Sequence, residues 1–382
     1  MGKLEKLFHK LSLPVPQPRI RLKALPDSPM AVSSGTVSVR QAAEALYGIT
    51  GMGACKAPLA WAKRKKLLPP ENSKKVSRQA FCHMLYRFSC CTRSNIGLPG
   101  QRLVFDFPDF SGVEDWAREG MQWALSAELL EEEPLLRPED TVDSDELYSI
   151  LQRYLEKLSR AREPGRGQAK IQVFGDSISD DKWGDRTTWV SLFPHRLGDA
   201  EVTIVNNAYG GGMLTAVPGR KNSVIRLLCS SSMLHPDADL VIIFAGTNDW
   251  ASDAGAMDSP VNDETYAGAL DKMISYIREN SRAKILLITP IGRYNEADRS
   301  RPGTDRQGEL LNARGYSLAD ASREILAAAR RWDTLGLDLY GFPAFSRENL
   351  GFTTIDGLHP NRLGDLLLAI RIYSFLNNEK TL

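Results

Sequence analysis

The sequence predicts two domains of different classes: a three-layer α/β/α domain built on a parallel sheet, preceded by a smaller all-α repeat domain. Apolar residues recur with a helical period up to about residue 160, whereas short apolar runs alternate with amphipathic segments after residue 165. A chain of 382 residues with 42% hydrophobic and 25% charged residues is long enough for two packed cores. We therefore expect an N-terminal arm over 1–36, an all-α domain over 37–162 and an α/β domain over 169–382.

The N-terminal arm is predicted to be extended, because residues 10–36 are rich in Pro and Ser. Basic residues and prolines interrupt its apolar residues, so we expect no secretory signal and, by default, a cytoplasmic protein. No apolar segment approaches the roughly 20 residues that a bilayer-spanning helix needs.

Charge and cysteine content narrow the function classes. A formal net charge of +1 gives no reason to expect nucleic-acid binding, and the short basic run at 62–66 is typical of a solvated helix face. The five cysteines are an odd number without metal-site spacing, and we expect them to be reduced. No His, Cys and carboxylate residues cluster at ligand spacing, so we expect neither a metal nor another cofactor.

The all-α domain is predicted from four segments with apolar residues near i, i+3, i+4 and i+7. These segments are 37–49, 77–88, 112–130 and 143–158. The sequence also repeats itself, because residues 59–88 match residues 121–154 in order. Each copy has a Trp-Ala helix, a Leu-Leu exit, a Pro-containing loop, a polar cap and a second helix. The helix at 37–49 matches the second half of a further, incomplete copy.

This pattern over residues 37–160 resembles the S-layer homology repeat, a helix–loop–helix unit that binds cell-wall polymers in many Gram-positive bacteria. In that family a Thr-Arg-Ala-Glu motif opens the second helix and contacts the polymer. The matching positions are Val39–Ala42, Ser77–Ala80 and Asp143–Glu146. The first two keep an arginine, Arg40 or Arg78, but lose the acid. The resemblance implies a bacterial protein at the cell surface that binds cell-wall polymer.

Ordinary helix capping explains the same positions, because Ser or Asp before a helix accepts hydrogen bonds from its first turn. We favour capping, since a protein without an export signal has no wall to bind. A third alternative is that residues 37–160 dock another protein, which suits the acidic motif at 143–146 equally well.

The α/β domain is predicted from five apolar runs, each followed by a helical segment. In order, the strands and helices are 169–174 with 187–197, 201–208 with 219–230, 239–246 with 264–280, 283–291 with 317–332, and 337–342 with 362–376. Short, apolar strands separated by helices indicate a parallel sheet covered on both faces. Because ligands of such sheets bind at the carboxyl ends of the strands, we expect the chemistry just after each run.

Residues suited to acyl transfer follow these strands. Ser177 follows the first strand, a glycine run at 210–212 follows the second and Asn248 follows the third, while Asp356 lies three residues before His359. A serine hydroxyl needs a base to take its proton, and the base needs an orienting acid. Asp356 can bind one ring nitrogen of His359 and leave the other to face Ser177. A glycine N–H, the Asn248 amide and the Ser177 N–H can hold an oxyanion.

Four motifs in the order GDS, N-x4-G, GTND and DxxHP resemble the SGNH (GDSL-type) hydrolase family over residues 169–380. The resemblance implies a flavodoxin-like three-layer fold and a serine esterase. The implied roles are nucleophile Ser177, base His359, orienting acid Asp356, and oxyanion donors Ser177, Gly211 and Asn248.

The oxyanion glycine is assigned by spacing. Gly211 lies five residues after Asn206, the usual spacing of the family, and either neighbour, Gly210 or Gly212, is the alternative. The expected substrates are carboxylic esters of short acyl groups such as acetyl, on a small molecule or a carbohydrate. The alternative function is a polymer-binding or protein-binding module with a weak or inactive hydrolase domain.

Two further sets of residues lie near these motifs. Asp180, Asp181 and Asp185 either repel anionic substrates or form a solvated loop, and we favour the loop. Trp183 and Trp250 either form walls of a substrate pocket or, as is commoner for large aromatic residues, belong to the core.

Overall fold

A computed structural model of the protein describes residues 35–50, 56–71, 73–92, 96–161, 167–182, 187–194, 196–197, 200–219, 221–230, 233–254, 257, 262–299, 301, 303–304 and 308–379. The chain forms two compact units. Unit 1 comprises the described residues of Met1–Ile96 and Asp106–Arg162, and unit 2 those of Gly97–Phe105 and Glu163–Leu382. Most of the predicted N-terminal arm, over 1–34, lies outside the described residues. The segment Gly97–Phe105 belongs to unit 2 although it falls inside the stretch that we expected to be one all-α domain.

Unit 1 is helical where its sequence has the helical period. Its α-helices are α2 (Val39–Gly48), α3 (Pro58–Arg64), α4 (Arg78–Thr92), α5 (Arg118–Ser126) and α6 (Ser144–Ala161). Short 3-10 helices occur at η1 (Val104–Asp106), η2 (Phe110–Gly112) and η3 (Asp115–Ala117), with η1 beginning in unit 2. The segment 112–130 was expected to be one helix. It is instead split between η3 and α5, and α5 ends at Ser126.

Three valines show that unit 1 is built from three equivalent helix starts. The Val37 N–H donates to the Val142 carbonyl at 2.8 Å, the Val142 N–H to the Val76 carbonyl at 3.0 Å, and the Val76 N–H to the Val37 carbonyl at 2.9 Å. These bonds close a ring of three backbone segments. A helix begins two residues after each valine, namely α2, α4 and α6.

Unit 2 is built on a sheet in the order β2-β3-β1-β4-β5-β6. The strands are β1 (Gly167–Gly175), β2 (Arg196–Leu197), β3 (Ala200–Asn206), β4 (Leu240–Phe244), β5 (Lys284–Ile288) and β6 (Leu335–Leu337). β3, β1, β4, β5 and β6 are parallel neighbours, and β2 pairs with β3 in the antiparallel direction. All five residues of β4 are buried, as expected of a central parallel strand.

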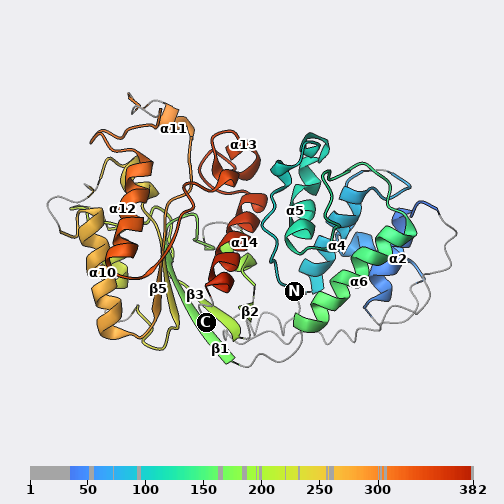
Figure 1. The fold of residues 1–382 in the computed structure, drawn as a ribbon, viewed down its shortest axis with the longest axis horizontal. Coiled ribbons are helices and arrows are strands. Elements are labelled where there is room, and N and C mark those ends of the chain that lie inside the picture. Colours follow the sequence, from blue (N-terminus) through green and yellow to red (C-terminus); the bar gives the residue numbers. More distant parts are fainter. Residues whose placement is uncertain are drawn as a thin grey trace. The chain divides into compact units, whose positions relative to one another are not determined.

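Helices cover both faces of this sheet, as Figure 1 shows with α10 and α12 on one side and α14 on the other. Inward residues of β1 such as Val173 share a core with α7 and α14, whereas Phe174 shares the opposite core with α8, α10 and α12. The helices of unit 2 are α7 (Trp189–Leu192), α8 (Val224–Leu228), α9 (Thr247–Ala251), α10 (Tyr266–Asn280), α11 (Glu296–Arg299), α12 (Leu318–Arg331), η4 (Pro343–Phe345), α13 (Leu350–Thr353) and α14 (Arg362–Asn378). The predicted three-layer fold with a preceding helical region is confirmed.

Three predicted elements of unit 2 differ from the structure. The helix expected over 187–197 is the single turn α7, because Pro194 cannot continue it, and the chain then forms the short strand β2. The helix expected near 219–230 is α8 alone, capped by Ser223, whose side chain accepts from the Arg226 N–H. The strand expected over 337–342 is β6, which ends at Leu337.

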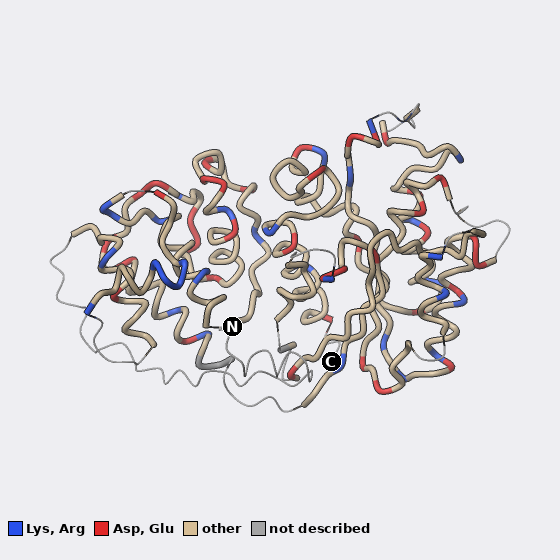
Figure 2. Tube along the Cα trace, turned by 180° about the vertical axis from the view of Figure 1, so that it is seen from behind, with Lys and Arg blue, Asp and Glu red and all other residues tan. Residues whose placement is uncertain are grey.

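Two further features of the described chain are the hydropathy of its helices and the distribution of its charged residues. No helix in the ranges given above is long and apolar enough to cross a membrane. Acidic and basic residues are interspersed along the described parts of both units, as Figure 2 shows.

Candidate active site

Ser177 lies where β1 ends and the chain turns. The Asp176 carboxylate accepts a hydrogen bond from the Ile178 N–H at 3.0 Å, and the Asp176 carbonyl accepts from Ser179 and Asp180 at 3.1 Å. Asp176 therefore caps a helical turn in which Ser177 is the first residue. Because Asp176 supplies the cap, the Ser177 hydroxyl is available for another partner.

That partner is His359. The Ser177 Oγ lies 3.0 Å from the His359 Nε2, and the His359 Nδ1 lies 2.7 Å from the Asp356 Oδ2. The other Asp356 oxygen accepts the His359 N–H at 2.7 Å and the Leu358 N–H at 3.0 Å. Burial acts to raise the pKa of Asp356, but the hydrogen bonds from His359 outweigh it and hold this pKa below its ordinary value. The structure thus brings the three predicted residues together, with His359 within hydrogen-bond distance of both Ser177 and Asp356.

The glycine loop after β3 separates the three candidate oxyanion donors. The Gly210 N–H donates to the Asp180 Oδ2 at 2.8 Å, and the Gly212 N–H donates to the Tyr209 carbonyl at 3.1 Å. The Gly211 N–H has no acceptor among the described residues. Gly211 has a φ of 71°, a left-handed conformation that a side chain would strain. Of the three glycines, Gly211 therefore has the uncommitted N–H.

Asn248 is the second residue of α9, directly after the turn that ends β4. One of its side-chain N–H groups donates to the Gly212 carbonyl at 3.0 Å. A primary amide has two such protons, so the second stays available while the first fixes the orientation of the side chain. The Ser177 N–H also has no acceptor within the described ranges. Open donors thus exist on Ser177, Gly211 and Asn248.

Two carboxylates that sequence reasoning did not assign hold the glycine loop in place. Asp249 is fully buried and accepts the Leu214 N–H at 2.8 Å, the Thr215 N–H at 2.9 Å and the Thr215 hydroxyl at 2.6 Å. Asp180 accepts the Gly210 N–H with one oxygen and the Lys182 N–H at 2.9 Å with the other. These contacts join segments about 30 residues apart, and the only signal in the sequence is the position of both acids beside a motif.

The preference for a solvated acidic loop was wrong for Asp180. Its exposure is 6%, because two backbone N–H groups need its oxygens. Asp181 is half-buried, and Asp185 lies outside the described residues, as does Trp183. Trp250 is 1% exposed and packs in the core of unit 2, with its Nε1 donating to the Tyr316 carbonyl at 2.9 Å.

Two acids below the site are shifted by burial. Burial raises the pKa of Asp176 to about 7 and that of Asp249 to about 6, with hydrogen bonds to each carboxylate acting in the opposite direction. Part of the rise for Asp176 comes from the negative charge of Asp249. Neither group faces the Ser177 hydroxyl by a hydrogen bond, so we regard both as positioning residues.

The polar residues at the three helix starts of unit 1 are used by the fold. Ser38 caps α2 and forms a reciprocal pair with Gln41, Ser77 accepts the Ala80 N–H at 3.2 Å, and Asp143 accepts the Glu146 N–H at 2.8 Å. Matching Val39 with Ser77 and Asp143 was therefore wrong by one residue, since Ser38 has the equivalent position.

The two arginines of these helix starts differ in exposure. The Arg78 side chain is 4% exposed and is bound by Glu133 at 3.0 Å and Glu146 at 2.5 Å. The Arg40 side chain is 63% exposed and pairs with Glu44 one helical turn away. The guanidinium of Arg78 is thus committed inside unit 1, whereas that of Arg40 faces solvent.

A comparison with protein families settles the class of unit 2. The family described as GDSL-like Lipase/Acylhydrolase matches residues 173–366, from β1 into α14. The protein belongs to this family. The predicted resemblance of this region to GDSL-type hydrolases is thereby confirmed, and membership of the lipase/acylhydrolase family supports an ester-hydrolase activity. A comparison with curated proteins found no match.

Several solved structures resemble a part of this protein. They include a possible lipase from Chitinophaga pinensis, with 21% identity, a TM-score of 0.42, and coverage of 56% of this chain and 100% of that chain. The aryl esterase of M. smegmatis has 17% identity, a TM-score of 0.41, and coverage of 55% and 99%. A carbohydrate acetylesterase from Sinorhizobium meliloti has 19% identity, a TM-score of 0.39, and coverage of 56% and 100%. At TM-scores this low, these likenesses carry no argument about substrate.

Proposed function

We propose that the protein is a serine esterase that hydrolyses carboxylic esters of short acyl groups such as acetyl. The observation that supports this most directly is the line of hydrogen-bond distances from Ser177 through His359 to Asp356, at 3.0 Å and 2.7 Å. A serine at a turn has no need of a histidine partner for folding, whereas acyl transfer requires one.

The first half of the reaction forms an acyl-enzyme. The Ser177 Oγ attacks the carbonyl carbon of the ester while the His359 Nε2 takes the hydroxyl proton. Asp356 holds the ring through Nδ1 and stabilises the positive charge that develops on it. The intermediate collapses when the bond to the alcohol oxygen breaks, and His359 returns the proton to that oxygen. The alcohol leaves, and the acyl group stays on Ser177.

We assign the oxyanion to the N–H groups of Ser177 and Gly211 and to the second amide proton of Asn248. None of these donors is paired within the described chain, so none has to break a hydrogen bond to bind a developing negative charge. Gly210 and Gly212 are excluded from this role because Asp180 and the Tyr209 carbonyl already accept their N–H groups. In the second half of the reaction, His359 takes a proton from water, whose oxygen attacks the acyl carbon. The bond from this carbon to the Ser177 Oγ then breaks, His359 returns the proton to Oγ, and the acid leaves.

Hydrolysis of p-nitrophenyl acetate and butyrate by the wild type and by Ser177→Ala tests this function. We expect loss of the nucleophile to lower kcat by roughly 10⁴-fold or more. Ser77→Ala is the matched control, because Ser77 also opens a helix but bonds only to its own unit. Equal rates for the wild type and Ser177→Ala would overturn the proposal.

A further inference from the structure

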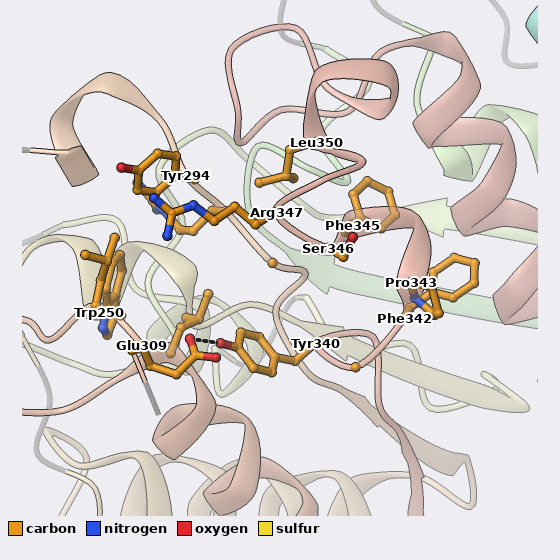
Figure 3. Close-up of a pocket in the computed structure, with 16 residues that line it drawn as sticks. Trp250, Tyr294, Glu309, Tyr340, Phe342, Pro343, Phe345, Ser346, Arg347 and Leu350 are labelled. Carbon is orange, nitrogen blue, oxygen red and sulfur yellow. Dashed lines mark hydrogen bonds between the residues drawn. The ribbon is translucent and has the colours of Figure 1, made fainter. Parts of the chain in front are cut away.

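Unit 2 contains a cavity of about 450 Å³. Its walls come from the segments that follow β4, β5 and β6, so it belongs to the same edge of the sheet as Ser177. Trp250, two residues after Asn248, lines it from α9. Figure 3 shows Tyr340 and Glu309 on one side of this cavity and Arg347 on another.

The cavity is tied to the turn that contains Asp356 and His359. Tyr294, which lines the cavity, donates its backbone N–H to the Gly357 carbonyl at 2.7 Å. An adjacent open groove of about 1060 Å³ is lined by Tyr294, Arg347 and also Asp356. Tyr294, Arg347 and Leu350 line both spaces, so the groove beside Asp356 adjoins the cavity.

Two arginines lie close to the ring of Tyr294. The guanidinium carbon of Arg347 lies 4.0 Å from the ring centre, and that of Arg299 lies 5.6 Å from it. In Figure 3 the Arg347 side chain extends across to Tyr294. Neither guanidinium group makes a hydrogen bond or an ion pair with any residue in the described part of the chain. Their donors are therefore available to a ligand.

Two neighbouring arginines, Arg293 and Arg301, differ from Arg347 and Arg299 because carboxylates within the fold bind their guanidinium groups. Arg293 binds Asp298 through two nitrogens, at 2.9 Å and 3.1 Å, and its side chain is 4% exposed. Arg301 binds Asp253 at 3.0 Å. The charges of those two guanidinium groups are compensated by carboxylates within the fold, whereas the guanidinium groups of Arg347 and Arg299 have no ion-pair partner in the described chain.

The carboxylates around the cavity and groove do not neutralise Arg347. Glu309 accepts the Tyr340 hydroxyl, and Asp356 is bound to His359. Glu296 lines the groove without an ion pair to either arginine, and Glu348 interacts with Arg347 only through space. An oxygen anion beside Arg347 would thus meet an open guanidinium fork, which binds carboxylate and phosphate with favourable geometry.

We infer that this cavity binds the alcohol portion of the ester and that Arg347, assisted by Arg299, selects alcohols with a negatively charged carboxylate or phosphate group. The inference rests on the proposed function, in which the acyl group is small and the alcohol is the larger part of the substrate. Tyr340, which lines the cavity and is half-buried, offers an aromatic contact to the body of that alcohol.

Matched acetate esters test the charge selection. The probes are 4-acetoxybenzoate and its neutral amide 4-acetoxybenzamide, the longer pair 4-acetoxyphenylacetate and its amide, and 4-acetoxyphenyl phosphate. We expect the wild type to prefer the carboxylate of at least one pair by roughly tenfold in kcat/KM, as one charge-assisted contact provides. The phosphate probe shows which anion is preferred.

Variants assign the selection to Arg347. We expect Arg347→Gln to reduce the preference to near unity and Arg347→Lys to keep part of it, because the ammonium retains the charge but not the fork. Arg282→Gln is the matched control, since Arg282 is exposed and precedes β5 at the opposite edge of the sheet. A preference that Arg347→Gln leaves unchanged would overturn the inference, as would equal kcat/KM within both pairs.

Binding to the inactive enzyme separates this inference from the proposed function. Calorimetry with Ser177→Ala measures the affinity for 4-acetoxybenzoate and 4-acetoxybenzamide without turnover. Tighter binding of the carboxylate, lost in the double variant with Arg347→Gln, supports the site even where the wild type hydrolyses neither ester, and in that case only the proposed function fails. Equal affinity for the two compounds contradicts the site.

Discussion

Ser77 in unit 1 and Ser177 in unit 2 occupy similar places and have different partners. Each follows an extended segment and begins a helical turn. The Ser77 Oγ accepts the Ala80 N–H at 3.2 Å and contacts Glu71, so its hydroxyl is used within its own helix start. At Ser177 the neighbouring Asp176 provides the cap, and the hydroxyl faces His359 instead. A polar residue becomes available for chemistry when another residue takes over its structural bond.

The same contrast holds for the positively charged and N–H groups of the two units. Arg78 is enclosed by Glu133 and Glu146. In unit 2, by contrast, the N–H groups of Ser177 and Gly211 have no acceptor in the described chain. Apart from the exposed Arg40, the polar groups described at the helix starts of unit 1 are bound within the fold, whereas these N–H groups at the strand ends of unit 2 are open to a ligand.

The largest effect in unit 1 is expected from Arg78→Met. This change removes the ion pairs to Glu133 and Glu146 and the hydrogen bond to the Leu136 carbonyl. We expect a loss of about 2–4 kcal/mol in the free energy of unfolding, because the two carboxylates lose a buried partner. Urea unfolding followed by circular dichroism measures it.

The exposed Arg40 provides the control for that prediction. Arg40→Met removes only a solvent-exposed pair with Glu44, which is worth at most about 0.5 kcal/mol. Equal stability of the Arg78 and Arg40 variants would mean that Arg78 is not structural. The comparison between the two units would then fail.

Asp176 provides a pH-dependent test in unit 2. Burial raises its pKa from 3.8 to about 7, so the folded protein favours the protonated carboxyl. The resulting stability is fully present below the ordinary pKa and is lost as the pH rises through the folded value. Asp176→Asn keeps an acceptor for the Ile178 N–H but cannot ionise.

We therefore expect the wild type to lose stability relative to Asp176→Asn between about pH 4 and about pH 7. The slope of the difference is about 1.4 kcal/mol per pH unit at most. Denaturant unfolding of both proteins across this range measures it. A difference that stays constant with pH would contradict the assignment of a protonated Asp176.

The smallest effect is expected from Ser77→Ala. Loss of the cap of α4 should reduce the free energy of unfolding by about 1 kcal/mol. Ser77→Asp retains a capping acceptor and should keep most of that stability. Thermal unfolding compares the three proteins, and rates on p-nitrophenyl acetate should be the same in all of them. A lower rate in Ser77→Ala would contradict the purely structural role assigned to Ser77.

Much of the fold could be predicted because its signals are local. The run Leu240–Phe244 is apolar throughout, and it forms the buried strand β4. The predicted bounds of two elements were wrong. Pro194 ends α7 after one turn, and β6 begins at Leu335, before the run that we expected to be the strand.

The reacting residues could also be predicted, because motifs at the ends of parallel strands meet at one edge of the sheet. The spacing of Asp356 and His359 is sufficient to place the carboxylate on the ring. The spacing from Asn206 indicated Gly211 but left Gly210 and Gly212 as alternatives, because the choice depends on Asp180 accepting the Gly210 N–H across 30 residues. Asp249 escaped prediction for the same reason.

Covalent labelling with a fluorophosphonate, followed by peptide mass spectrometry, tests the central claim most directly. Such reagents phosphonylate a serine whose proton a neighbouring base removes. We predict that the wild type is labelled at Ser177, that His359→Gln loses the label, and that Ser77 stays unmodified in both. A wild type without label on Ser177, or with equal labelling of Ser77 and Ser177, would contradict the account.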